Sequence, residues 1–342
     1  MMPAHVKEAF TFQSIACASL GSPFMEQLCR LLAERDWPET NLRERVFSWP
    51  GDLSPRGESV PLRVAGGLHA LYLNEVAFSG VYPPAEVSDD ELWTAVDAAL
   101  ISHDMFLCDW VQSAPQTNEV RRSAAIIPAG HVIAERFGLP IRTSELGASG
   151  GLNLKWDRYG LKFADTVFGQ DDTLVLEPDW TGPPPPAAHP NVVERRGVDL
   201  NPLDPTNPED ALRLRAYLWP DQPDRLTRTA AAIGIAEPLV DQGDAIDWLE
   251  ARLEHVPGQV HMIYHTIAWQ YFPADQQAKG RSLIEAAGAT ATTDSPLAWF
   301  SMENDGGERG AALTLRLWPG DITLDLGRAD FHGRWVNWTG QC

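Results

Sequence analysis

Acidic and small residues cluster in four short segments, each of which follows an apolar run. The first segment, residues 145–151, reads E-L-G-A-S-G-G and places Glu145 at the end of such a run. The other three contain Asp199, Asp244 and the adjacent pair Tyr264 and His265. Glycine lets a backbone approach a ligand closely, and carboxylates accept hydrogen bonds from hydroxyl and amino groups. The combination predicts a nucleoside-type ligand site.

Alternating apolar runs and helical stretches predict the sheet that must hold these segments. Strands are expected at 141–145, 192–199, 238–240, 260–265, 297–302, 312–318 and 322–326, and helices between them at 210–219, 244–255 and 276–287. This alternation predicts a mostly parallel sheet covered on both faces. Pro319, Gly320 and Asp321 form a hairpin-type turn, which predicts an antiparallel edge. Ligands bind at the carboxyl ends of parallel strands, where all four segments would lie.

The first part of the chain has a different, mainly helical pattern. Helices are expected after the Ser22-Pro23 start signal and at 62–73, 91–107 and 119–137. We therefore divide the chain into a helical region, 1–140, and an α/β domain, 141–342. A proline-rich excursion at about 160–191, with four consecutive prolines at 183–186, interrupts that domain and is expected to be an exposed, polyproline-like loop.

Composition limits the classes of function. The chain has 342 residues, 27 Lys and Arg against 47 Asp and Glu, and a formal net charge of −20; both predicted parts are acidic. Such a surface repels phosphates, so we expect neither nucleic-acid nor membrane partners. The four cysteines include no C-x-x-C pair, which favours reduced thiols, and no metal site is predicted. Without a clear signal peptide or a spanning segment, the protein is expected to be cytoplasmic.

Several longer motifs are distinctive. They are S-P-F at 22–24, L-R-V-A-G-G-L-H-A-L at 62–71, T-N-E-V-R-R-S-A at 117–124, E-L-G-A-S-G-G-L-N-L at 145–154, W-D-R-Y at 156–159, G-V-D-L-N-P-L-D-P at 197–205 and L-R-L-R-A-Y-L-W-P-D-Q at 212–222. These motifs resemble those of a bacterial family catalogued as domain of unknown function 2332, and more broadly class I S-adenosylmethionine-dependent methyltransferases. The resemblance implies a Rossmann-like, methyltransferase-type sheet, mostly parallel with an antiparallel edge, behind a helical N-terminal region that covers the cleft.

The methyltransferase resemblance implies roles for individual residues. The first motif would lie beneath the methionine part of S-adenosylmethionine, with Glu145, Gly147, Ser149 and Gly151 as cofactor-binding residues. Asp199 would accept hydrogen bonds from the ribose hydroxyls and Asp244 from the adenine amino group. The sequence departs from E-x-G-x-G-x-G because Ser149 occupies the middle glycine position.

Catalytic and substrate-binding residues are predicted around this cofactor site. His265, or Tyr264 beside it, would remove a proton from the methyl acceptor. The substrate-binding candidates are Asn118, Arg121, Arg122, Asp157 and Tyr159. Structural alternatives are open for several of the site residues: His265 can be a hydrogen-bonded core histidine, Asp157 can form an internal ion pair, and Asp199 can cap a helix.

Two other functions remain open. Gly147-Ala-Ser149-Gly-Gly151 also fits G-x-S-x-G, the nucleophile elbow of serine hydrolases, with Asp244 and His265 in the order of a triad. A non-catalytic module that binds S-adenosylmethionine or another nucleoside fits the altered glycine motif. We favour methyl transfer to a small or medium-sized acceptor; the acceptor and the oligomeric state are not specified by the sequence.

Overall fold

The computed structural model describes residues 2–55, 57–170, 173–307 and 309–340, which form two compact units. Unit 1 comprises Met1–Thr117 and Pro208–Ala230, and unit 2 comprises Asn118–Asn207 and Ala231–Cys342. This division differs from the predicted boundary at residue 140. The helix before the first strand belongs to unit 2 because its apolar side chains pack on the sheet. Residues 208–230 join unit 1 although the strands of that sheet continue on both sides of them in sequence.

Unit 1 is built from helices. They are α1 (Ala4–Ser19), α2 (Pro23–Glu34), α3 (Asn41–Phe47), α4 (Val60–Leu73), α5 (Asp89–Ser102), α6 (Asp104–Trp110), α8 (Pro208–Ala216) and the first part of α9 (Pro223–Gly234). Local signals fix several starts: Ser22 caps α2 ahead of Pro23, and Ser88 and Glu91 form a capping box on α5. The single helix predicted at 91–107 is two helices that meet at His103.

Helix α4 lies in the middle of this unit and is buried on nearly every side. Its two glycines permit close packing. A Cβ atom at Gly66 would lie 2.6 Å from the Tyr217 ring, and one at Gly67 would lie 2.9 Å from Leu107. The glycine pair therefore gives neighbouring side chains room inside a helix, at the cost in helix propensity that glycine always carries.

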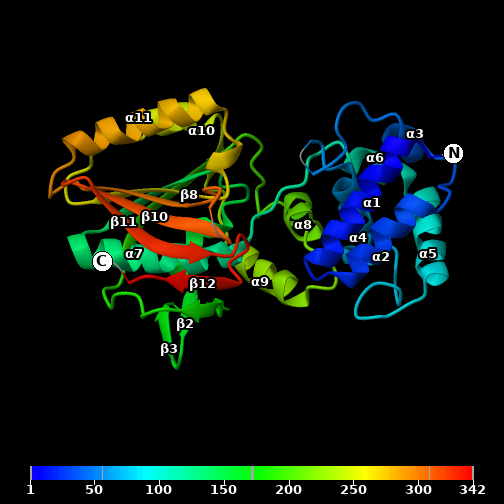
Figure 1. Ribbon diagram of the computed structural model, residues 1–342, viewed down its shortest axis with the longest axis horizontal. Coiled ribbons are helices and arrows are strands. Elements are labelled where there is room, and N and C mark those ends of the chain that lie inside the picture. Colours follow the sequence, from blue (N-terminus) through cyan, green and yellow to red (C-terminus); the bar gives the residue numbers. More distant parts are fainter. Residues whose placement is uncertain (1, 56, 171–172, 308, 341–342) are drawn as a thin grey trace. The chain divides into compact units, whose positions relative to one another are not determined.

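Unit 2 contains a nine-stranded mixed sheet in the order β5-β12-β11-β10-β9-β8-β1-β6-β7 (Figure 1). Its parallel half consists of β1 (Ile141–Leu146), β6 (Val192–Asp199), β7 (Val240–Gln242), β8 (Val260–Thr266) and β9 (Leu297–Glu303). In chain order these five strands run 3-2-1-4-5 across the sheet. The prediction of an α/β chain with a mostly parallel sheet is confirmed.

The remaining strands extend the sheet in a mainly antiparallel manner. They are β10 (Ala311–Trp318), β11 (Ile322–Ala329), β12 (Trp335–Trp338) and β5 (Asp179–Thr181), and β9, β10, β11 and β12 pair antiparallel to one another. The predicted hairpin between β10 and β11 is confirmed. The edge continues beyond it, because β12 and then β5 add further strands, of which β5 pairs parallel with β12.

The excursion at about 160–191 is more ordered than a simple loop. It holds β2 (Gly160–Phe163), β3 (Thr166–Gly169) and β4 (Val175–Leu176), which form a separate small sheet, and then β5. In the proline run, Pro183 and Pro184 are exposed as predicted, but Pro185 is buried. The Pro183 carbonyl accepts a hydrogen bond from the Trp180 indole, and the Pro186 carbonyl lies 2.9 Å from His131 Nδ1.

Helices cover both faces of the main sheet, as Figure 1 shows for α7 on one side and α10 and α11 on the other. Helix α7 (Ser123–Phe137) packs with Tyr264 and Phe300, whereas α10 (Ala245–Glu250) and α11 (Ala274–Thr290) pack with Ile263 and Leu297. Neighbouring residues of a strand thus contribute to opposite cores. Three short 3-10 helices complete the unit: η1 (Val120–Arg122), η2 (Leu152–Arg158) and η3 (Trp269–Tyr271).

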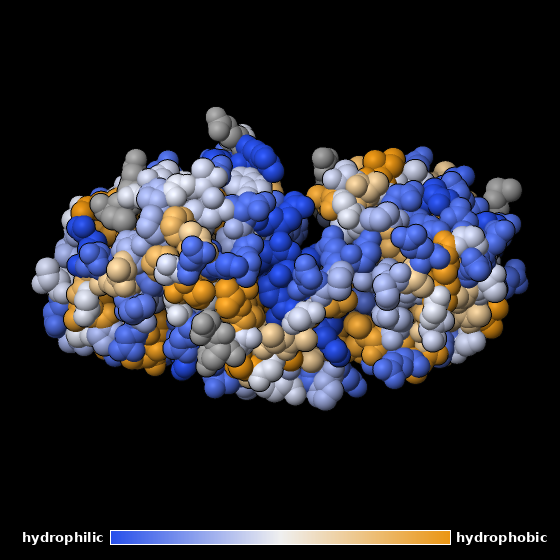
Figure 2. All heavy atoms as spheres, turned by 90° about the horizontal axis from the view of Figure 1, so that it is seen from below, coloured by the Kyte–Doolittle hydropathy of each residue, from blue (hydrophilic) through white to orange (hydrophobic). Residues whose placement is uncertain are grey.

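On the surface seen in Figure 2, hydrophobic residues lie in small groups among hydrophilic ones. The large hydrophobic side chains that are exposed are spread over both units and include Ile15, Met105, Leu200 and Tyr271. Within the described ranges, none of the helices is long and apolar enough to cross a membrane.

Candidate functional site

The parallel half of the sheet has a topological switch point between β1 and β8. From β1 the chain proceeds to β6 and β7 on one side, and later to β8 and β9 on the other. The loops that leave the carboxyl ends of β1 and β8 therefore diverge, which creates the crevice where open α/β sheets bind ligands. The turn after β1 and the loop after β8 border this crevice.

The turn after β1 has a strained, tightly packed backbone. Gly147, Ser149 and Gly151 all have left-handed φ angles, of 73°, 53° and 70°. A Cβ at Gly147 would lie 2.6 Å from that of Ala268, and one at Gly151 would lie 2.8 Å from Val240. Both glycines are thus required by contacts inside the protein. Ser149 differs from the two glycines because a left-handed φ is unfavourable for a residue with a side chain. Backbone strain of this kind is concentrated at functional sites.

A second strained residue borders the crevice at the end of β8. Ile267 has a φ of 51°, a conformation that β-branched residues rarely adopt. Its N–H donates to the Met302 carbonyl at 2.8 Å, which holds it against the end of the neighbouring strand. Both loops at the switch point therefore carry a non-glycine residue in the left-handed region.

Glu145 is a buried acid at the end of β1, only 2% exposed. The Tyr264 hydroxyl lies 3.3 Å from its Oε2 and 3.2 Å from the Asn153 carbonyl oxygen. Burial raises the pKa of Glu145 to about 8, although the Tyr264 hydroxyl and the Arg122 charge act to lower it. The carboxyl group is therefore mostly protonated at neutral pH, and a cation placed beside it would favour its ionisation.

Asp199, at the end of β6, holds the turn in place. Its Oδ2 accepts a hydrogen bond from the Ser149 N–H at 2.9 Å, and its Oδ1 accepts one from the Asn201 N–H at 3.0 Å. A carboxylate oxygen can accept more than one hydrogen bond, so each keeps capacity for a ligand. The next side chain, Leu200, is 66% exposed and offers an apolar surface beside this acid.

Asp244, after β7, is the N-cap of α10. Its Oδ1 accepts hydrogen bonds from the N–H groups of Ile246 at 2.8 Å and Asp247 at 3.1 Å. Its Oδ2 makes no hydrogen bond with the described residues. Asp244 therefore has the helix-capping role that was considered for Asp199, and one oxygen remains for a ligand.

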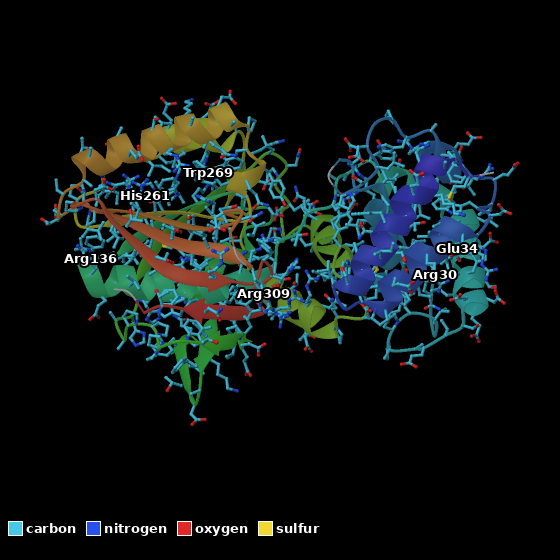
Figure 3. All side chains as sticks on the ribbon, viewed as in Figure 1. Arg30, Glu34, Arg136, His261, Trp269 and Arg309 are labelled. Atoms are coloured by element: carbon cyan, nitrogen blue, oxygen red, sulfur yellow. The ribbon has the colours of Figure 1, made fainter. Side chains whose placement is uncertain are left out.

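His265 is placed where it cannot act as a free base. Its Nδ1 lies 2.7 Å from Glu303 Oε1, and its Nε2 accepts a hydrogen bond from the Trp299 indole at 3.0 Å. The indole N–H can only donate, so the ring proton is on Nδ1, toward Glu303. The ring is 1% exposed and stacks on Trp269, which is labelled in Figure 3. Both nitrogens are engaged, so the predicted role as a general base does not fit the geometry.

Tyr264 is also unsuited to proton removal. Its ring is fully buried beside Glu145, and burial together with that carboxyl raises the pKa of its hydroxyl well above the usual value. Its hydroxyl is shared by two acceptors, as described above. The residue therefore positions Glu145, and the second predicted base is corrected to a structural role.

Glu303, at the end of β9, borders the crevice and is not among the site residues predicted from the sequence. Its Oε1 accepts hydrogen bonds from the N–H groups of Ala268 and Trp269, both at 3.0 Å, as well as contacting His265. Burial acts to raise its pKa, but these hydrogen bonds together with the His265 contact lower it below the usual value. Glu303 thus fixes the loop after β8. Its position directly after the predicted strand at 297–302 was the available signal.

The hydrolase triad is not assembled. His265 Nε2, which would have to accept the Ser149 proton, is occupied by Trp299, and Asp244 caps a helix instead of contacting His265. The G-x-S-x-G match therefore reflects the tight turn alone.

Of the substrate-binding candidates, Asn118 and Arg122 contact the two loops that border the crevice. Asn118 accepts a hydrogen bond from the Leu152 N–H at 2.9 Å, which anchors the turn after β1. Arg122 donates to the carbonyl groups of Thr266 and Phe331, both at 3.0 Å, and so ties itself to the end of β8. Arg121 has a buried Nε that finds no hydrogen-bond partner among the described residues.

Asp157 and Tyr159 are instead packed into the structure. Asp157 forms a two-point ion pair with Arg195 of β6, in which Nε donates to Oδ1 at 3.2 Å. Tyr159 is fully buried, and its hydroxyl donates to the Leu152 carbonyl at 2.7 Å. Neither side chain is available to a substrate, so these two predictions are corrected to structural roles. In the parts of the chain that are described, no group of three or more His, Cys, Asp or Glu side chains is arranged to hold a metal.

Among known proteins, the chain matches one family model over nearly its whole length. The family model described as "Uncharacterized protein conserved in bacteria (DUF2332)" matches residues 7–338. No curated protein matches the chain. Among solved structures, the crystal structure of SCL7 in Oryza sativa matches at 14% identity and a TM-score of 0.25, over 89% of this chain and 66% of that one, just under two thirds of its length. A likeness of that size carries no argument about the fold or the activity.

Proposed function

The chain belongs to the bacterial DUF2332 family, and from the geometry of unit 2 we propose that it binds S-adenosylmethionine at the β1–β8 switch point and transfers the methyl group to a small or medium-sized acceptor. The sheet would then be Rossmann-like and of the methyltransferase type. The observation that carries the proposal is the succession of Glu145, Asp199 and Asp244 at the ends of adjacent strands of one parallel half-sheet. Strand order 3-2-1-4-5 is typical of sheets that bind nucleotides at this edge.

The chemical groups at this edge fit the parts of the cofactor. Asp199 retains acceptor capacity for the ribose hydroxyls, and the free Oδ2 of Asp244 can accept from the adenine amino group. Exposed Leu200 offers an apolar surface for a flat ring. Arg122 can bind the carboxylate of the cofactor's methionine part. Glu145 suits the cationic sulfonium centre of the cofactor, because a nearby positive charge would stabilise the ionised form of this carboxyl group. When bound, the cofactor supplies an activated methyl group.

The protein's own contribution to the reaction would be mainly positioning. Glu303 fixes the loop after β8, Asn118 anchors the turn after β1, and Arg122 ties the end of β8. Because Tyr264 and His265 are both engaged, the geometry favours an acceptor that presents a free lone pair at neutral pH, such as a carboxylate, an imidazole or a thioether. Such an acceptor needs no proton removed before it is methylated.

The same engagement of Tyr264 and His265 supports a second candidate, a nucleoside-binding module without catalysis. Cofactor binding would then serve to change the stability or conformation of unit 2. The two candidates share the site and differ only in whether the methyl group leaves it.

Calorimetric titration of the full chain with S-adenosylmethionine and with its demethylated product tests the shared claim. We expect saturable binding that Asp199→Ala weakens at least about tenfold, as loss of hydrogen bonds from a charged acceptor implies. Asp275→Asn, on the exposed surface of α11, is the matched control and should bind like the parent. No heat and no thermal shift at millimolar ligand, with Asp199→Ala indistinguishable from the parent, would exclude the cofactor.

Transfer is tested separately with cofactor carrying a radiolabelled methyl group and a small-molecule extract of a bacterial cell. Label that appears in a small molecule, and disappears with Asp199→Ala, supports methyl transfer. Tight binding without any labelled product supports the non-catalytic module.

A further inference from the structure

Unit 1 contains a pocket of about 700 Å³ that the proposed function does not use. Its walls come from the start of α2, from residues 83–87 before α5 and from residues 220–223 between α8 and α9. The volume is within the range of small-molecule sites. Two motifs from the sequence analysis, S-P-F at 22–24 and L-W-P-D-Q at 218–222, meet here. The Asp221 carboxylate accepts hydrogen bonds from the Ser22 hydroxyl at 2.6 Å and the Phe24 N–H at 3.1 Å.

The walls of this pocket are mainly apolar and rigid. Phe24 packs edge-on against Tyr82 with ring centroids 4.7 Å apart. Val87 contributes a further apolar side chain from the segment at 83–87. Five of the lining residues are prolines, namely Pro23, Pro83, Pro84, Pro220 and Pro223. Proline has no backbone N–H, so these positions offer a ligand apolar surface and carbonyl oxygens but no donor.

The side-chain donors of the lining are already engaged. Arg30 donates from Nε to Glu26 and from both terminal nitrogens to Asp89, at 3.0 to 3.1 Å. Arg30 and Glu34, one turn apart on α2, are labelled in Figure 3. Nη1 of Arg30 lies 3.6 Å from Oε2 of Glu34. Gln27 donates to the Val87 carbonyl and to Asp89. An anion would therefore meet a guanidinium that three carboxylates already neutralise.

Acceptors, in contrast, remain available. Asp221 and Glu86 both line the pocket, and neither has a cationic partner among the described residues. Asp221 accepts only from neutral donors, and Glu86 is exposed at the rim. Because Glu26 balances Arg30, the lining carries an excess of two negative charges. The pocket combines an apolar body with unpaired carboxylates.

We propose that this pocket binds a small amphipathic cation, a protonated amine carried on an aromatic or aliphatic group. The apolar part would lie against Phe24, Val87 and the prolines, and the ammonium group would donate to Asp221 and Glu86. Charge complementarity disfavours carboxylates and phosphates, and the lack of free side-chain donors disfavours neutral acceptors. The site is independent of the cofactor site in unit 2.

Three probes of nearly equal size test the claim on the full chain: 2-phenylethylammonium, 2-phenylethanol and 3-phenylpropanoate. Calorimetry and protein-observed NMR are expected to show saturable binding of the ammonium compound. The alcohol should bind at least about tenfold more weakly, and the carboxylate should not bind. Equal binding of the ammonium compound and the alcohol, or any tighter binding of the carboxylate, would overturn the proposal.

Variants locate the binding. Glu86→Gln should weaken the ammonium probe about threefold and Glu86→Lys should abolish its binding; both changes are on an exposed side chain and leave the fold intact. Asp221→Asn should weaken it about tenfold while still accepting from Ser22. Glu8→Gln, an exposed acid outside the pocket, is the control. If Asp199→Ala abolishes binding while the Glu86 variants do not, the probe is in unit 2 and the proposal is wrong.

Discussion

Replacing Glu145 with glutamine should make the protein more stable, and increasingly so as the pH rises. The pKa of Glu145 is about 8 in the folded protein, whereas the ordinary pKa of a glutamate, which applies to the unfolded chain, is 4.5. Between these two pH values unfolding releases a proton. The stability contribution of the group is therefore greatest below pH 4.5 and falls by about 1.4 kcal/mol per pH unit until pH 8.

Between pH 5.5 and pH 7.5, this linkage lowers the free energy of unfolding of the parent protein by about 2.5 kcal/mol. Glu145→Gln removes it, because the amide does not ionise and can still accept the hydrogen bond from Tyr264. The quantity to measure is the difference in free energy of unfolding between variant and parent at the two pH values, from urea titrations of the transition that includes unit 2. A constant offset caused by altered packing cancels in this comparison.

Glu135→Gln is the matched control, since Glu135 is an exposed acid on α7. Its difference from the parent should be the same at both pH values. The difference in free energy of unfolding between Glu145→Gln and the parent could instead be constant, or the variant could become less stable relative to the parent as the pH rises. Either result would show that Glu145 is not a buried, protonated carboxyl. Its proposed affinity for a cation would then have no basis.

Three further perturbations test the packing around the site. Asp157→Asn leaves partly buried Arg195 without its carboxylate and should cost about 3 kcal/mol of unfolding free energy, measured by urea titration. Gly130→Ala should cost about 1 to 3 kcal/mol, because a Cβ there would lie 2.3 Å from a buried indole, whereas Gly234→Ala, with no atom within 4 Å, should be neutral or slightly stabilising. Glu303→Ala should speed hydrogen exchange of the amides at 268 and 269 at least about tenfold; unchanged protection there would mean that the loop needs no carboxylate.

Much of the sheet could be predicted from local patterns. The strand predicted at 192–199 coincides with β6, and the other six predicted strands each overlap an observed one. These runs are apolar because both faces of the sheet are covered, which gives a signal that requires no knowledge of distant residues. β2, β3, β4, β5 and β12 were missed because each spans only two to four residues, so alternation is too brief to detect.

The site was predicted less completely than the sheet. Glu145 and Asp199 are where strand ends and turn residues placed them, because the carboxyl edge follows from the parallel topology. The engagement of His265 was not predictable, since its partners Trp299 and Glu303 come from another strand and only the folded register brings them together. The same holds for Asp157, whose partner is separated from it by the excursion. Long-range pairing decides which polar residues are free, and sequence spacing does not report it.

The division of unit 1 into two chain segments has a consequence for synthesis on the ribosome. Residues 1–117 emerge first, but Ala70 and Trp110 complete a small core only with Leu212 and Ala216 of α8. At about 5 to 20 residues per second, that surface stays uncovered for several seconds or more, while three strands of the main sheet, β1, β5 and β6, are synthesised. A nascent chain arrested before residue 208 should therefore be a better client for chaperones than one arrested after residue 230.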